Sequence, residues 1–425
     1  MIYLDYQATT PLAPEALKAM LPWLEQGHAN PHSPHRAGRQ ARAAVEVARD
    51  QVAALLPSGG RVVFTSGATE ALNWAIKGAS GGIMTTAIEH AAVLDTAAAT
   101  GRPLTILPID ADGLVAAHPD GTDLNQREPL PFRGGVGVGS RLRPLAGGDT
   151  PPPAQWQVND APHRLGHAGG MTDLPLLKGR GDSGSHPATQ ALPHGTGLVA
   201  AMLVNNEIGT IQPVAALAKE AHRAGAWMLC DAVQGYGRIA IPTSVDMVAI
   251  SAHKIHGPKG IGALWIRDGI TLPPLLHGGD QEGGRSGTLS PALCAGFGAA
   301  ARLMAMRIEE DAAHVERLWT LAVDRLGADW TINGSTDQRY HGNLNVRRDG
   351  LDVARLMSDC RDIAFSAGSA CASGSGRTSH VLTALGLSVP QAKSSIRIGF
   401  GRYTSEEELI QAIDQLVAAA RAQRP

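Results

Sequence analysis

Short apolar runs alternate with amphipathic stretches over much of this chain, and each pattern predicts a different element. Apolar runs bounded by Gly, Pro or polar residues predict strands at 62–64, 83–87, 104–109, 198–204, 226–230, 246–251 and 261–266. Apolar residues at helical spacing predict helices at 34–56 and 213–224, and another beginning just after Gly67. Ser33 is expected to cap the first helix, with Pro34 as its first residue. This alternation favours a mostly parallel sheet with helices on both faces.

One region departs from the pattern. Residues 118–195 are dense in Gly, Pro, Arg and His and show no sustained helical or strand period. Such a composition buries too little apolar surface to offset the entropy lost on ordering. A structureless loop of this length is uncommon inside a domain. The segment is therefore predicted to be an exposed, disordered insertion.

Polar residues follow the predicted strands at their carboxyl ends, which is where ligands bind in parallel sheets. Each of them, taken alone, is more often a helix cap or a hydrogen-bonded core residue than a ligand-binding group. Their common position is the stronger signal. They are His90, Asn205 to Glu207, Asp231, Gln234 and Ser251 to Lys254.

Two of these strand ends have a recognisable chemistry. Lys254 follows a buried strand, where a lysine loses enough hydration to act as an amine nucleophile and to hold an aldehyde cofactor. The segment Thr65 to Glu70 joins a strand to a helix through Gly67, so free backbone N–H groups and the helix dipole meet at one point. That geometry suits an anion, although an ordinary capped helix has the same sequence pattern.

Composition narrows the possible functions. At 425 residues the chain is long enough for two domains. Its 37 basic and 39 acidic residues give no electrostatic footprint for nucleic acid or an anionic membrane. No apolar run approaches the length of a membrane span, and the first residues lack the pattern of a signal peptide. The widely spaced cysteines suggest neither a metal site nor a disulfide framework, which fits a reducing cytoplasm.

Nine segments of the chain together resemble the cysteine desulfurases, pyridoxal-phosphate enzymes of the class-V aminotransferase superfamily, and most of all their housekeeping bacterial group. Their order and spacing follow that family over about 1–117 and 196–415. The segments are YLDYQATTP (3–11), FTSGATEALNWAIKG (64–78), EH (89–90), VNNEIGTIQPV (204–214), DAVQ (231–234), SAHKIHGPKGIGAL (251–264), RSGT (285–288), SAGSACAS (366–373) and SSIRIGFGRYTSEEE (394–408).

The resemblance implies an α/β fold of the aspartate aminotransferase type. A large pyridoxal-phosphate domain would span 14–305, and a smaller α+β domain would combine 1–13 with 306–425. The implied reaction converts L-cysteine to L-alanine and passes the sulfur to an acceptor, most simply a scaffold protein for iron–sulfur cluster assembly. The active form would be a cytoplasmic homodimer.

The resemblance also implies a role for individual residues. Lys254 would hold the cofactor as a Schiff base, Asp231 would pair with its pyridine nitrogen, and His90 would stack on the ring and move protons. The remaining roles concern the edges of the cofactor and the substrate. The ring oxygen would be contacted by Gln234 and Asn206. The phosphate would be held by Ala68, Thr69, Ser251 and His253, and by Thr288 from a second subunit. Arg397, with Asn345 beside it, would bind the substrate carboxylate.

Cys371 would be the nucleophile that receives sulfur. It stands among Gly, Ser and Ala residues, which argues for an exposed, mobile loop, whereas Cys230, Cys294 and Cys360 lie in apolar or helical runs and are expected to be buried. Three features depart from the family: the insertion, a stretch at 278–288 that is one residue short, and Gln7 in place of a smaller residue.

Two other functions stay open at this point. A selenocysteine lyase or an aminotransferase of the same fold would need Lys254 but not Cys371. Alternatively, the insertion could have left an inactive remnant that no longer binds cofactor.

Overall fold

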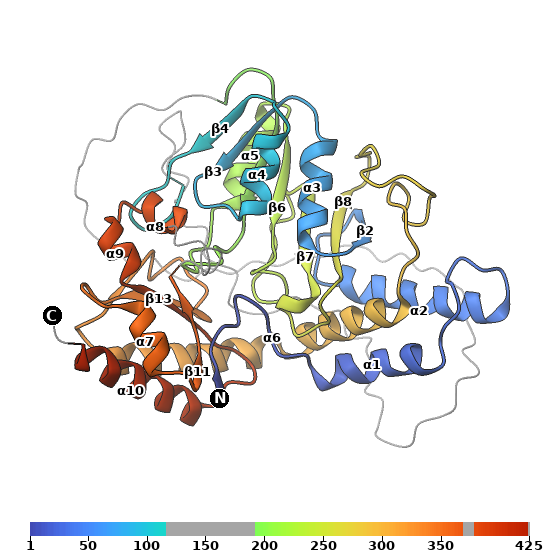
Figure 1. The fold of residues 1–425 in the computed structure, drawn as a ribbon. Coiled ribbons are helices and arrows are strands. Elements are labelled where there is room, and N and C mark those ends of the chain that lie inside the picture. The colour runs from blue at the N-terminus through green and yellow to red at the C-terminus, as the bar shows by residue number, and fades with distance from the viewer. Residues whose placement is uncertain (116–191, 369–377, 424–425) are drawn as a thin grey trace, which may run out of the picture. The chain divides into compact units, whose positions relative to one another are not determined.

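A central sheet organises the computed structural model, which describes residues 1–115, 192–368 and 378–423 (Figure 1). Within these residues its strands lie in the order β2-β8-β7-β6-β5-β3-β4, and β8 alone runs antiparallel to its neighbours. The predicted mostly parallel sheet is therefore confirmed. The strands are β2 (Gly60–Thr65), β3 (Gly82–Thr86), β4 (Leu104–Leu107), β5 (Thr196–Met202), β6 (Trp227–Asp231), β7 (Met247–Ser251) and β8 (Gly262–Arg267).

Helices cover both faces of this sheet because successive strand residues point to opposite sides. Phe64 of β2 packs into one hydrophobic core and its neighbour Val63 into the other. The first core is closed by α1 (Pro14–Glu25), α2 (Arg36–Ala53), α5 (Val214–Arg223) and the first half of α6 (Pro291–Leu326). The second is closed by α3 (Ala68–Gly78) and α4 (Ala91–Ala99), which lie on the other side of the sheet in Figure 1.

A further core forms around the C-terminal elements. Helix α6 links the two regions, since Met304 packs against the large sheet and Val315 packs into the C-terminal core. Among the described strands, one small sheet pairs β1 (Ile2–Tyr3) with β11 (Ile363–Ala364), and another has the order β12 (Ser366–Ala367), β13 (Ser395–Gly399), β10 (Asn343–Arg347), β9 (Thr331–Ile332). The accompanying helices are α7 (Val353–Asp359), α8 (His380–Ala384), α9 (Val389–Lys393) and α10 (Glu406–Ala422).

The described residues all belong to one unit of the fold. The predicted division between 14–305 and the segments 1–13 and 306–425 falls inside α6 and stays a prediction. No helix in the described ranges is long and apolar enough to cross a membrane.

Two local expectations need correction. The first concerns the cap of α2: the helix begins at Arg36, and its N-cap is His35, whose Nδ1 accepts a hydrogen bond from the Gly38 amide at 3.1 Å. The Ser33 amide instead donates to the Asn30 carbonyl at 3.0 Å and closes a turn. Pro34 and His35 both precede the first helical residue, so Ser33 lies too far from the helix to cap it. The second concerns the predicted insertion. Its last residues, 192–195, lead directly into β5, and the Gly195 carbonyl accepts from the Gly82 amide at 2.8 Å. Residues 116–191 lie outside the described part of the chain.

Candidate active site

A pocket of about 630 Å³ opens at the carboxyl edge of the central sheet. Its walls come from the ends of β2, β3, β5, β6 and β7, from the N-terminal segment and from β13. Ten residues predicted from the sequence line it: Ala68, Thr69, His90, Asn206, Asp231, Gln234, Ser251, His253, Lys254 and Arg397. The structure thus gathers at one place side chains from positions more than 300 residues apart.

Lys254 ends the 3₁₀ turn η1 (Ala252–Lys254), directly after β7. Its Nζ donates to the Ala8 carbonyl at 2.9 Å and to the Gln7 carbonyl. Burial, and then the positive charges of Arg397 and Arg238, lower the pKa of Lys254 to about 8. A useful share of this amine is therefore neutral, and nucleophilic, near neutral pH.

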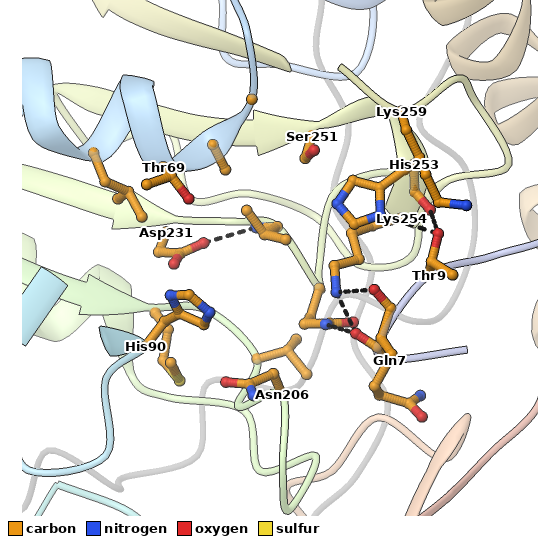
Figure 2. A pocket seen from close by; sticks show the side chains of 18 of the residues that line it. Gln7, Thr9, Thr69, His90, Asn206, Asp231, Ser251, His253, Lys254 and Lys259 are labelled. Atoms are coloured by element: carbon orange, nitrogen blue, oxygen red, sulfur yellow. Dashed lines mark hydrogen bonds between the residues drawn. The ribbon is translucent and has the colours of Figure 1, made fainter. Parts of the chain in front are cut away.

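His90 and Asp231 face Lys254 across the pocket (Figure 2). Asp231 ends β6, and its Oδ1 accepts from the Val233 amide at 3.0 Å. Burial raises the pKa of Asp231, although the Val233 bond and the nearby His90 and Lys254 oppose the rise. A buried carboxyl of this kind favours a cationic ligand atom, because a positive partner stabilises its charged form.

His90 is held in one orientation as the N-cap of α4. Its Nδ1 accepts from the Ala92 amide at 3.0 Å. In the neutral imidazole the proton then sits on Nε2. The ring can therefore present a flat face and one N–H donor to the pocket.

The end of the pocket near α3 suits an anion. Gly67 is the N-cap of α3, and the amides of the first helical turn have no acceptor within the helix. The hydroxyls of Thr69 and Ser251 also line this end (Figure 2). Burial, and then Lys254 and Lys259, lower the pKa of His253 to about 4, so this imidazole acts as a neutral donor or acceptor.

Arg397 supplies a second anion-binding group. Its side chain is only 1% exposed, yet it lines the pocket from β13. Nη1 donates to the Asn206 carbonyl at 2.9 Å, Nη2 donates to Asp5 Oδ1 at 2.8 Å, and Nε has no partner among the described residues. Asp231 is the one acid among the lining residues that the structure describes, against Lys254, Lys259 and Arg397. The pocket is therefore suited to a ligand with more than one negative group.

The sequence of the chain matches the profile of the family described as aminotransferase class-V over residues 2–130 and 173–412. This chain belongs to the class-V aminotransferase family. Among its curated relatives, a protein named cysteine desulfurase IscS from Rickettsia bellii is 35% identical, with 97% of this chain and 89% of the relative covered. The protein of the same name from Rickettsia felis is 35% identical over the same shares. The relatives thus place this class-V aminotransferase homologue among the cysteine desulfurases.

Solved structures agree with this assignment. A NifS-like protein superposes with a TM-score of 0.75 at 27% identity, covering 98% of each chain. A protein titled SspA in complex with cysteine superposes with a TM-score of 0.68 at 29% identity, covering 95% of this chain and all of the other. Between its two matched segments the family profile leaves out 131–172, a shorter stretch than the predicted insertion at 118–195.

Two predicted site residues of this class-V aminotransferase, Asn345 and Thr288, do not line the pocket, and a third lies outside the described residues. Asn345 on β10 is fully buried and is the cross-strand partner of Arg397 on β13. Both polar atoms of its side chain are occupied, since Nδ2 donates to the Glu207 carbonyl at 3.0 Å and Oδ1 accepts from Asn333 Nδ2 at 2.8 Å. Thr288 is exposed and does not line the pocket, so its role in a second subunit stays a prediction. Cys371 lies outside the described residues.

The other cysteines behave as expected. Cys230, Cys294 and Cys360 are free and buried, and burial raises the pKa of each thiol. A buried thiol with a raised pKa is a poor nucleophile. These three thiols are therefore poorly suited to receive sulfur from a substrate.

The N-terminal segment contributes groups that the sequence analysis missed. The Gln7 carbonyl accepts from Lys254 and, at 2.9 Å, from Gln234 Nε2. Thr9 Oγ1 lies 3.1 Å from His253 Nδ1. The Gln7 side chain turns out of the pocket, where its Nε2 donates to the Gly342 carbonyl at 2.7 Å (Figure 2). The resemblance included this segment as YLDYQATTP (3–11), but a local string does not say which distant loop the segment contacts.

Proposed function

We propose that this chain is a pyridoxal-phosphate-dependent cysteine desulfurase that converts L-cysteine to L-alanine and leaves the sulfur as a persulfide on Cys371. The observation that carries the proposal is Lys254. Its amine has a pKa of about 8 and stands opposite Asp231, in a pocket with anion-binding groups at two ends. A buried amine of lowered pKa is the group that captures an aldehyde.

The donor set fits pyridoxal phosphate group by group. The first turn of α3, with Thr69, Ser251 and His253, would hold the phosphate. Asp231 would pair with the protonated pyridine nitrogen, the cation that its buried carboxyl favours, and the flat face of His90 would lie against the ring. Asn206 and Gln234 would contact the ring oxygen, which requires Gln234 Nε2 to exchange its bond to the Gln7 carbonyl. Thr288 of a second copy of the chain would complete the phosphate site, so the active form would be a homodimer.

When bound, the cofactor supplies an aldehyde and a ring that accepts electrons. The residues of the chain do the rest. Arg397, which lines the pocket, would bind the substrate carboxylate through its planar guanidinium. That contact would orient the α-carbon toward Lys254. The neutral amine of Lys254 would take the α-proton, and His90 Nε2 would move protons at the substrate thiol.

Sulfur transfer would then use Cys371. Its thiolate would attack the substrate sulfur, so that one S–S bond forms and one C–S bond breaks. The electron pair of the C–S bond stays on the substrate carbon, which takes up a proton and leaves as L-alanine. Substrate cysteine and the Cys371 thiol thus give alanine and an enzyme persulfide. The persulfide would pass to an acceptor protein, such as an iron–sulfur cluster scaffold, in a reducing cytoplasm.

The alternative is a lyase or aminotransferase that uses the same pocket without Cys371. Alanine and sulfide should therefore be measured together after L-cysteine is added, with a thiol reductant present, for the wild type and Cys371→Ala. A desulfurase forms both products in equal amounts and loses both in the variant. Undiminished turnover by Cys371→Ala would favour the lyase. Failure of the wild type to bind cofactor would mean an inactive remnant.

A further inference from the structure

Arg397 is held from behind by a carboxylate that does not line the pocket. Asp5 Oδ1 accepts from Arg397 Nη2 at 2.8 Å and from Ser366 Oγ at 2.8 Å. Ser366 Oγ lies 3.3 Å from the same Nη2, so the three side chains form a closed triangle. Asp5 is absent from the pocket wall, whereas Arg397 is part of it. Asp5 therefore contacts a pocket-lining guanidinium without itself lining the pocket.

The backbone fixes all three corners of this triangle. Asp5 forms a parallel bridge with Gly399, two residues beyond Arg397 on β13. Ser366 on β12 is the direct cross-strand partner of Arg397. Three segments of the chain thus converge on one guanidinium. An arginine side chain has many rotamers, and a carboxylate on one nitrogen leaves it few.

Asp5 also sets how much positive charge reaches the pocket. Arg397 is almost completely buried, so its charge is poorly screened by water. The nearby Lys254 is affected by both groups: Arg397 lowers its pKa and Asp5 raises it. A carboxylate 2.8 Å from Nη2 offsets part of the positive charge that a ligand in the pocket meets at Arg397.

We propose that Asp5 is a positioning residue of the carboxylate site, which both orients Arg397 and limits the strength with which it holds the carboxylate of an amino acid. This inference rests on the proposed function, because it takes Arg397 to be the group that binds the substrate carboxylate. The two effects of Asp5 are separable. Asn keeps an oxygen acceptor for Nη2 and Ser366 but removes the charge, whereas Ala removes both.

The test compares two ligands that differ only in the carboxylate. The cofactor-loaded wild type, Asp5→Asn and Asp5→Ala are titrated with L-alanine and with L-alaninamide, and the absorbance of the bound cofactor reports binding. Asp5→Asn should bind L-alanine about three- to tenfold more tightly, because the guanidinium charge is no longer offset. Asp5→Ala should bind it at least threefold more weakly. Neither variant should change the affinity for L-alaninamide by more than about twofold.

Asp414→Asn is the matched control, since it removes a carboxylate from the exposed pair with Arg325 and should change none of these affinities. Equal weakening of L-alanine binding by Asp5→Asn and Asp5→Ala, or parallel changes for both ligands, would overturn the proposal. If the wild type takes up no cofactor, the proposed function fails by itself. In that case the cofactor-free wild type and both Asp5 variants are titrated with propionate and with propanamide, and binding is followed by the thermal shift of the protein. Propionate should again bind most tightly to Asp5→Asn and most weakly to Asp5→Ala, with propanamide little changed.

Discussion

The lowered pKa of Lys254 gives the most quantitative prediction. An ordinary lysine has a pKa of 10.5, and that of Lys254 is about 8. At pH 7.5, about a quarter of the Lys254 amines would be neutral, compared with about one in a thousand for the ordinary lysine. Since only the neutral amine attacks an aldehyde, the lowered pKa raises the reactive population by roughly 200-fold.

The assay measures how fast cofactor-free protein captures pyridoxal phosphate between about pH 6 and pH 10, by absorbance. The rate should rise with pH, because deprotonation frees the amine, and should reach half its maximum near pH 8. Borohydride should then fix the cofactor to the wild type and not to Lys254→Ala. Lys259→Ala is the control, because Lys259 lines the same pocket but is exposed, and it should keep the covalent link.

Two results would refute this reasoning. A half-maximal rate above about pH 10 would mean that Lys254 is an ordinary solvated lysine. A borohydride-fixed cofactor in Lys254→Ala would mean that another amine is the attachment point. Far-ultraviolet circular dichroism of each variant checks that the loss is chemical rather than a loss of fold.

Three further outcomes are expected. Asp231→Asn should weaken cofactor affinity about tenfold to a hundredfold in an equilibrium titration, since a neutral amide cannot form the charge-assisted bond to a pyridinium; unchanged affinity would contradict the pairing. Leu416→Ala should lower the free energy of unfolding in urea by about 2–5 kcal/mol, because this side chain is fully buried in the C-terminal core, whereas Leu24→Ala, exposed by 63%, should change it little. Deleting about 119–190 should preserve cofactor binding, because loop-closure entropy changes by only roughly 0.6 kcal/mol per doubling of length; a deletion variant that aggregates while the full chain is active would show that the segment is structural.

Periodicity was enough to predict the central sheet. The strands predicted at 83–87, 226–230 and 246–251 match β3, β6 and β7 to within one residue at each end, because strands buried on both faces are continuous apolar runs. The polar groups at their carboxyl ends were predictable for the same reason. Parallel strands bring those ends to a common edge whatever the rest of the chain does.

Contacts between distant segments were not predictable from these patterns. The Gln7 carbonyl meets Lys254 across 247 positions, and Asp5 meets Arg397 across 392. Neither contact produces a periodic pattern of apolar and polar residues in the sequence. For Asn345 the position was predicted but the contacts were not. It lies beside Arg397 as expected, but its side-chain amide hydrogen-bonds to Glu207 and Asn333 instead of facing the pocket. The cap of α2 depended on a His side chain accepting a backbone N–H, which residue preferences underweight.

The location of the transferred sulfur tests the central claim most directly. The protein would be incubated with L-cysteine without reductant, alkylated, digested and analysed by mass spectrometry for an added sulfur on each cysteine. The proposed function predicts a persulfide on Cys371, together with one L-alanine for each sulfur bound, and none on the buried Cys230, Cys294 and Cys360. A persulfide on one of those three, or alanine formed with no sulfur on the protein, would contradict it.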